Sequence, residues 1–220
     1  MDFDLKLVRN DIAKIKPLVA KKTTAIFNPI KFKRLGKGIE GVVRGIDNVA
    51  IKWFDRDAKD PCEKEYIDTL HERSLLGLGF DIKYAPILDT LYTDKYLYAF
   101  MPWLKGPTLA KCTLEDLHAV GQSGFEQFFA DIEKLSHAKL SPDLFKASNI
   151  IITRDENSKR HLSLIDFRAD YTKETAKFLK ADLVFGFNLV TERLNHFADY
   201  KKIKMQREIL ENLETAYKHI

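Results

Sequence analysis

Two short segments carry the residues of this sequence that are best suited to bind phosphate groups. The segment 36–43, GKGIEGVV, has glycines at three positions where a side chain would keep the backbone away from phosphate oxygens. The segment 49–52, VAIK, follows at hairpin distance and places the ammonium of Lys52 at the end of an apolar strand. A glycine-rich hairpin and a solvated lysine are the plain alternatives. The order and spacing of the two segments favour a phosphate site.

At this point the sequence resembles the protein-kinase superfamily, over about residues 32–168. The resemblance implies an α+β, two-lobed fold, with a five-stranded N-lobe sheet carrying one helix and a reduced, mainly helical C-lobe. It also implies ATP as a cofactor. The segment 97–106, LYAFMPWLKG, looks like the kinase hinge, with Met101 behind the adenine. The residues implied to hold ATP are Gly36, Gly38, Gly41, Val43, Ala50, Lys52, Met101 and Trp103.

A kinase lysine is held in place by a carboxylate from the helix that follows it. Three glutamates compete for this role, and the sequence favours Glu72, because ERSLL at 72–76 looks like the kinase pattern of an acid followed by apolar residues. Glu65 lies nearly two turns earlier on the same helix face and is the first alternative. Glu63 is the third candidate. A solvated helix face is the plain interpretation of each of these acids.

Two later segments match the catalytic and metal-binding positions of kinases. By resemblance, Asp143 in SPDLFKASN (141–149) is the catalytic aspartate that orients and deprotonates the acceptor hydroxyl, and Asn149 binds Mg²⁺. Asp166 in LIDFR (164–168) is implied as the second ligand of Mg²⁺. A turn or helix cap is the plain interpretation of Asp143, and the end of a strand is that of Asp166.

The same segments depart from the kinase pattern at three places. Ser141-Pro142 stands where kinases have His-Arg, and Arg168 stands where they have Gly. The step from Asp143 to Asn149 is also one residue longer than in the family. These departures leave a pseudokinase open, an ATP-binding scaffold that transfers nothing.

The Ile-Asp-Phe-Arg variant at 165–168, the context of Glu72 and the short C-terminal part look like the minimal type III secreted effector kinases of enteric pathogens (the OspG type). This resemblance implies a protein Ser/Thr kinase, a protein substrate and an activating host protein. It also implies a cytoplasmic protein, or one secreted into a host cell. A small kinase acting on a sugar or on a lipopolysaccharide core is the alternative enzyme.

The elements that position these residues can be predicted from hydrophobic periodicity and from the residues that begin and end helices and turns. Helices are expected at 4–20 and 61–76, and again from about 113 onward. A final helix places Ile209, Leu210, Leu213, Ala216 and Tyr217 toward a core. The expected strands lie at 32–43 (with the glycine turn inside), 49–54, 85–92, 96–103, 149–153 and 161–165. A short turn is expected at 45–48. The predicted domains are an N-terminal helical extension (1–30), an N-lobe (31–104) and a C-lobe (105–220).

Composition narrows the class of protein. The 220 residues include 45% hydrophobic and 31% charged residues, as in an ordinary folded protein. No apolar stretch approaches the length of a membrane span, and the N-terminus lacks the apolar core of a signal peptide. Cys62 and Cys112 are too few for a disulfide framework and do not have the spacing of zinc ligands. A net charge of +4 is mild, and no motif indicates a nucleic-acid partner.

Overall fold

The computed structural model describes residues 3–21, 32–38, 41–54, 59–142, 147–155 and 157–168. The chain divides into two compact units. Of the described residues, the sheet unit comprises those in Phe3–Gly79 and Ala85–Leu104, and the helix–hairpin unit comprises Phe80–Tyr84 and those from Lys105 to Arg168. The predicted catalytic Asp143 and the predicted C-terminal helix at 209–217 lie outside the described residues.

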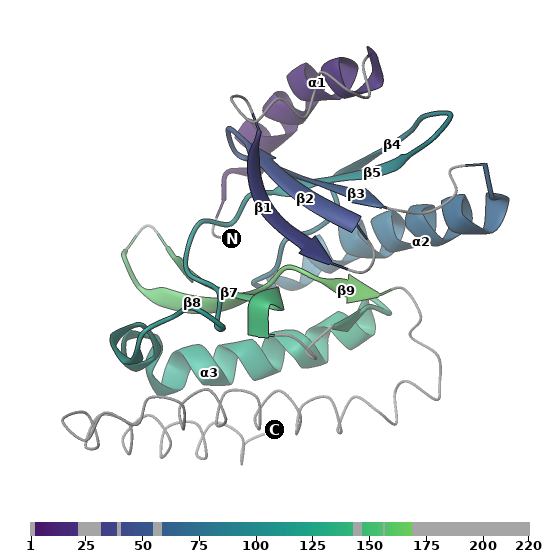
Figure 1. The fold of residues 1–220 in the computed structure, drawn as a ribbon. Coiled ribbons are helices and arrows are strands. Elements are labelled where there is room, and N and C mark those ends of the chain that lie inside the picture. The colour runs from purple at the N-terminus through teal and green to yellow at the C-terminus, as the bar shows by residue number, and fades with distance from the viewer. Residues whose placement is uncertain are drawn as a thin grey trace. The chain divides into compact units, whose positions relative to one another are not determined.

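The sheet unit contains one five-stranded antiparallel sheet, in the order β1-β2-β3-β5-β4 (Figure 1). The strands are β1 Lys33–Gly38, β2 Gly41–Ile46, β3 Val49–Phe54, β4 Asp89–Tyr92 and β5 Leu97–Pro102. Helices accompany the sheet, so the fold is α+β. The expectation of an α+β fold with a five-stranded sheet is confirmed.

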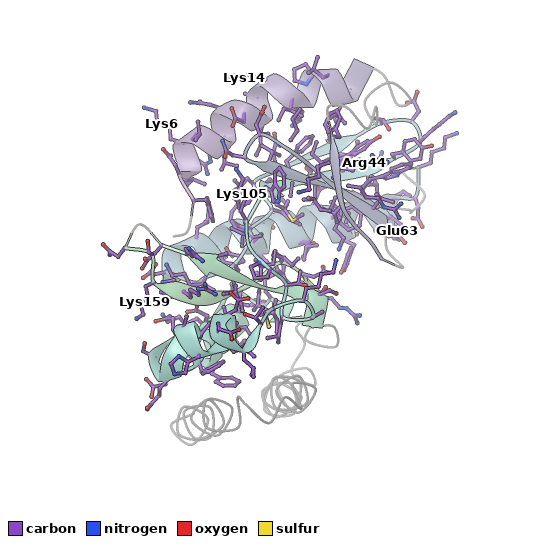
Figure 2. All side chains as sticks on the ribbon, turned by 60° about the vertical axis from the view of Figure 1, so that its left-hand side comes forward. Lys6, Lys14, Arg44, Glu63, Lys105 and Lys159 are labelled. Atoms are coloured by element: carbon purple, nitrogen blue, oxygen red, sulfur yellow. The ribbon has the colours of Figure 1, made fainter. Side chains whose placement is uncertain are left out.

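Helix α1, Leu5–Lys21, covers one face of this sheet. Its N-terminus is capped by Asp4, whose Oδ1 accepts hydrogen bonds from the backbone N–H groups of Lys6 and Leu7 at 2.9 and 3.0 Å. Lys6 and Lys14 extend from the helix on its outer side (Figure 2). Its apolar side chains recur every three or four residues and pack against β3 and β5. They are Val8, Ile12, Ile15 and Val19, all buried.

Helix α2, Pro61–Gly77, lies on the other side of the sheet (Figure 1). The Asp60 side chain caps it by accepting a hydrogen bond from the backbone N–H of Cys62 at 2.9 Å, and Pro61 suits the first helical position. The helix ends at Gly77 and continues as the short 3-10 turn Leu78–Phe80. The predicted helix 61–76 is therefore confirmed to within one residue.

Two predictions of local structure are wrong. The strand expected at 85–92 begins only at Asp89. Pro86 has no N–H to give to a ladder, and the N–H of Ile87 donates to the Ser74 hydroxyl of α2 at 2.6 Å. The turn expected at 45–48 is confined to residues 47–48, because the first two positions belong to β2.

The helix–hairpin unit packs α3, Leu114–His137, against a β-hairpin (Figure 1). The hairpin pairs β7, Ile150–Arg154, with β8, Arg160–Leu164. Thr113 and Asp116 cap the start of α3 reciprocally: the N–H of each residue donates to the side chain of the other. Gly121 interrupts the helix with φ 62° and ψ 175°.

The same unit contains a second, two-stranded sheet. Its strands are β6, Ser141–Pro142, and β9, Phe167–Arg168, which pair antiparallel. The 3-10 turn η2, Ala147–Asn149, leads directly into β7.

Candidate nucleotide and metal site

Strand register brings most of the predicted ATP-binding residues onto one face of the sheet, which we call the glycine face. Gly36 pairs with Val43, Val43 with Lys52, and Lys52 with Ala99. In the neighbouring row of residues Ala50 pairs with Met101. Directly opposed residues of an antiparallel pair point to the same face, and residues two apart along a strand do so as well. The glycine face therefore comprises Gly36, Gly38, Gly41, Val43, Gly45, Ala50, Lys52, Phe54, Leu97, Ala99 and Met101.

Lys52 lies in the middle strand of the sheet and is largely buried, with 9% of its surface exposed. Its Nζ lies 4.9 Å from the centre of the Phe54 ring, two residues along the same strand. A buried ammonium in a sheet is unusual for a merely solvated lysine, because burial removes the hydration of its charge. This position weighs against the plain interpretation of Lys52.

Gly36 and Gly41 of the β1–β2 hairpin differ in whether the fold itself requires a glycine at that position. At Gly41 the backbone has φ +147°, and an added Cβ would lie 1.7 Å from the Trp53 carbonyl oxygen, so the fold itself requires glycine. At Gly36 an added Cβ would meet nothing within 4 Å. Packing does not explain Gly36, and the open space beside it fits close approach by a ligand.

The predicted hinge residues lie at the other end of the glycine face. Met101 is buried beside Ala50. The Trp103 ring covers Gly45, where an added Cβ would come within 2.9 Å of the ring. Lys33 places its Nζ 5.9 Å from the Trp103 ring centre, a cation–π contact at the edge of this face. The Trp103 ring can therefore pack directly on the backbone of Gly45, because that residue has no side chain.

Helix α2 packs on the glycine face, and its acids do not all point toward it. Tyr92 belongs to this face through its pairing with Leu97, and its hydroxyl contacts the Asp68 carboxylate of α2. Glu65 and Glu72 are exposed. The buried residues of α2 recur at a spacing of three or four residues. Four residues before the first of them, Ile67, lies Glu63, which is half-buried. This series is Glu63, Ile67, Leu70 and Ser74.

Glu63 therefore lies in line with the buried residues of α2, whereas Glu72 does not. Figure 2 labels Glu63, which belongs to the first turn of α2. The nearby Lys64 places its Nζ 6.0 Å from the Tyr92 ring centre, so this end of α2 lies beside the row that contains Phe54, Leu97 and Tyr92. The burial pattern of the helix, which the sequence alone left ambiguous, is the signal that separates the glutamates.

The predicted metal ligands lie at one end of the hairpin in the helix–hairpin unit. Asn149 immediately precedes β7 and is buried, with 8% exposed, and Asp166 follows β8 after one residue. The backbone N–H of Ile165 donates to the Asn149 carbonyl at 3.0 Å, which ties the two segments together. Residues that are distant in sequence are thus brought to the same hairpin end.

The β6–β9 pairing brings the two predicted catalytic segments together. Pro142 pairs with Phe167, the residue after Asp166. The Phe167 ring is buried and lies 5.7 Å from the Tyr84 ring centre. Asp143 follows β6 directly in sequence and lies outside the described residues. The phosphate-binding candidates belong to the sheet unit, and Asn149 and Asp166 belong to the helix–hairpin unit.

The side-chain oxygens of Asn149 and Asp166 are of the type that binds a magnesium ion. Among the residues that the structure describes, no three His, Cys, Asp or Glu side chains gather as a site made of protein ligands alone would require. Asn149 and Asp166 offer one amide and one carboxylate. That set suits Mg²⁺, which keeps waters and takes further oxygens from phosphates.

Two other acids have perturbed pKa values for structural reasons. Burial raises the pKa of the Asp131 carboxyl, although it accepts a hydrogen bond from the backbone N–H of Lys83 at 2.7 Å. Asp131 thereby fastens α3 to the Phe80–Tyr84 segment. A hydrogen bond from His161 lowers the pKa of Asp155, which also accepts backbone N–H groups of its hairpin loop. Neither acid lies among the predicted site residues.

No protein-family model and no curated protein matches this chain. Within the described ranges, no helix combines the length and the apolar character needed to cross a membrane.

Proposed function

We propose that this protein is a phosphotransferase that moves the γ-phosphate of Mg-ATP to a hydroxyl group, with the sheet unit as the N-lobe and the helix–hairpin unit as the reduced C-lobe of a kinase-like fold. The observation that carries the proposal is the shared glycine face. Register alone brings Gly36, Val43, Ala50, Lys52 and Met101 to one side of one sheet.

Each group has a defined role in the proposed reaction. Bound Mg-ATP supplies the phosphoryl group. The Lys52 ammonium offsets phosphate charge in a largely buried position, where electrostatic attraction is stronger than in water. Asn149 and Asp166 hold the magnesium ion. Asp143 orients the acceptor hydroxyl and accepts its proton.

The preferred acceptor is Ser or Thr of a protein, in line with the resemblance to secreted effector kinases. On that resemblance the enzyme acts in a cytosol-like compartment or in a host cell, with an activating host protein. The departures at Ser141, Pro142 and Arg168 favour the pseudokinase as the second candidate. A kinase acting on a sugar or a lipopolysaccharide core differs only in the acceptor.

A labelled-ATP transfer assay with the purified protein, alone and with a cell lysate or sugar acceptors, tests the proposal. Lys52→Ala is expected to reduce transfer by about 10²-fold or more while the protein stays folded. Asp143→Asn is expected to reduce transfer by roughly 10²- to 10⁴-fold and to leave ATP affinity nearly unchanged. Equal activity of a folded Lys52→Ala variant and the wild type would exclude Lys52 as the phosphate anchor.

Magnesium dependence is tested separately by thermal shift. Mg-ATP should raise the melting temperature of the wild type more than that of Asp166→Ala. An equal rise in both proteins would refute the metal site. ATP binding without transfer to itself, to proteins or to sugars would instead indicate the pseudokinase.

A further inference from the structure

The Lys52 ammonium is held over an aromatic ring of its own strand. Its Nζ lies 4.9 Å from the centre of the Phe54 ring, within the range of a cation–π interaction. Phe54 is 1% exposed and Lys52 is 9% exposed, so the contact is largely shielded from water. Shielding strengthens the attraction between a cation and the negative face of a ring.

The direction of the contact is set by strand register. Lys52 pairs with Val43, whereas Phe54 pairs with Gly41, and Gly41 pairs in turn with Gly38. The ring beside the Lys52 ammonium therefore belongs to the row that contains these two glycines. That row closes the β1–β2 hairpin, where the sequence predicts the phosphate-binding turn.

A lysine side chain has four carbon–carbon bonds to rotate and loses about 2 kcal/mol of rotamer entropy when it is held in one place. A ring face can hold the ammonium without acting as a hydrogen-bond acceptor of the kind that a carboxylate or phosphate supplies. Phe54 can therefore help to hold Lys52 near the turn through a contact that is not a hydrogen bond.

We infer that Phe54 is a positioning residue for Lys52, which aims the ammonium at the β- and γ-phosphates of a nucleotide bound at the glycine turn. This inference rests on the proposed function and adds a residue that acts through the lysine. The sequence already indicates that Phe54 shares a face with Lys52, because alternate residues of the strand VAIKWF point to the same side.

Substitution of Phe54 by Leu removes the ring and keeps an apolar side chain. Phe100→Leu is the matched control, because Phe100 is also fully buried in this sheet but points to the opposite face, against α1. The affinities of both variants for Mg-ATP and for adenosine are measured by calorimetry. Phe54→Leu is expected to weaken Mg-ATP binding roughly 5- to 30-fold and to leave adenosine binding unchanged. Phe100→Leu should change the ratio of the two affinities little.

Pentafluorophenylalanine at position 54 is the second variant, because it keeps the size of the ring and reverses the charge distribution on its face. It should reproduce the selective loss of Mg-ATP affinity even if Phe54→Leu does not fold. If Mg-ATP and adenosine lose affinity to the same extent, the positioning role of Phe54 is overturned. It is also overturned if the fluorinated ring leaves Mg-ATP affinity unchanged.

The proposed function can be judged separately from this inference. If the wild type binds no Mg-ATP, the proposed function fails and the inference fails with it. If the wild type binds Mg-ATP and Lys52→Ala abolishes the preference for ATP over adenosine, while both Phe54 variants keep it, only the role of Phe54 is excluded.

Discussion

At the scale of single residues, the site depends on which side chains point toward the glycine face. Lys52 lies on this face at the centre of the sheet, and Glu63 lies in line with the buried residues of α2, whereas Glu72 is exposed. The preference for Glu72 came from a short sequence pattern and remains a prediction. The burial pattern of α2 gives Glu63 the stronger claim.

Glutamine substitutions distinguish the three glutamates. We expect Glu63→Gln to reduce phosphate transfer by about 10-fold or more, because an amide attracts an ammonium less strongly than a carboxylate does. Glu65→Gln and Glu72→Gln are the controls on the exposed side of the same helix, and each should keep nearly full activity. The measurement is transfer from labelled ATP at saturating magnesium. A larger loss in Glu72→Gln than in Glu63→Gln would restore the assignment made from the sequence.

Tyr98 gives the sheet unit a defined response to alkaline pH. Burial raises the pKa of its hydroxyl from 10.0 to about 12, and this hydroxyl has no hydrogen-bond partner among the described residues. The unfolded chain ionises first as pH rises. The contribution of Tyr98 to stability is therefore complete below pH 10 and is lost between pH 10 and about 12, by at most about 1.4 kcal/mol per pH unit.

Tyr98→Phe should remove that part of the alkaline loss. At pH 8 the variant should be as stable as the wild type or more stable, because a buried hydroxyl without a partner is removed. Urea midpoints at pH 8 and pH 11 provide the measurement. Some alkaline loss should remain, since the pKa of Tyr92 is also raised to about 12, by burial and by its hydrogen bond to Asp68. A variant with the same pH profile as the wild type would disprove the assignment to Tyr98.

At the scale of elements, the β1–β2 hairpin separates glycines that the fold requires from a glycine that it does not. Gly41 has a positive φ and lies against the backbone of β3, whereas Gly36 is beside open space. The glycine-rich segment 36–43 does not by itself distinguish these two positions. Their surroundings differ: the hairpin requires glycine at position 41, whereas the space beside Gly36 leaves room for a ligand.

Alanine substitutions test this division. Gly41→Ala should lower the free energy of unfolding by about 2–4 kcal/mol, because its Cβ would overlap the Trp53 carbonyl. Gly36→Ala should change it by no more than about 0.5 kcal/mol, yet weaken ATP binding if nucleotide approaches there. Urea denaturation and calorimetric titration with Mg-ATP measure the two effects. A strongly destabilised Gly36→Ala would show that packing requires this glycine after all.

At the scale of the whole molecule, α1 belongs to the core of the sheet unit. The sequence predicts residues 1–30 as an N-terminal extension, but the inner side of α1 packs with Val49, Ile51 and Phe100 of the sheet. These three side chains are consequently buried beneath α1. A chain that lacks α1 would expose these side chains to water.

Ile12→Ala measures the contribution of α1. Ile12 is 3% exposed, and its truncation should lower the free energy of unfolding by about 2–5 kcal/mol. Leu7→Ala on the outer side of the same helix, where 45% of the side chain is exposed, should cost no more than about 0.5 kcal/mol. Chemical denaturation of both variants gives the comparison. Equal small losses would mean that α1 contributes little to the unit.

The sequence by itself determined most of the described elements and which residues share a face of a strand. Period-2 alternation in VAIKWF places Lys52 and Phe54 on one side, apolar spacing of three and four residues predicts α1, and Asp60-Pro61 and Gly77 mark the ends of α2. These features are local, because they follow from the geometry of a single strand or helix. Helix boundaries were accurate where a cap such as Asp60 marked them.

Tertiary structure decided which of these faces meet. Cross-strand register aligned Gly36, Val43 and Lys52, and the packing of α2 left Glu63 half-buried and Glu72 exposed. The hydrogen bond from Ile165 to Asn149 and the β6–β9 pairing brought segments together that no periodicity connects. The physical reason is that a pattern in one element defines its buried side but not its neighbour. The neighbour is chosen by the packing and backbone hydrogen bonds of the folded chain.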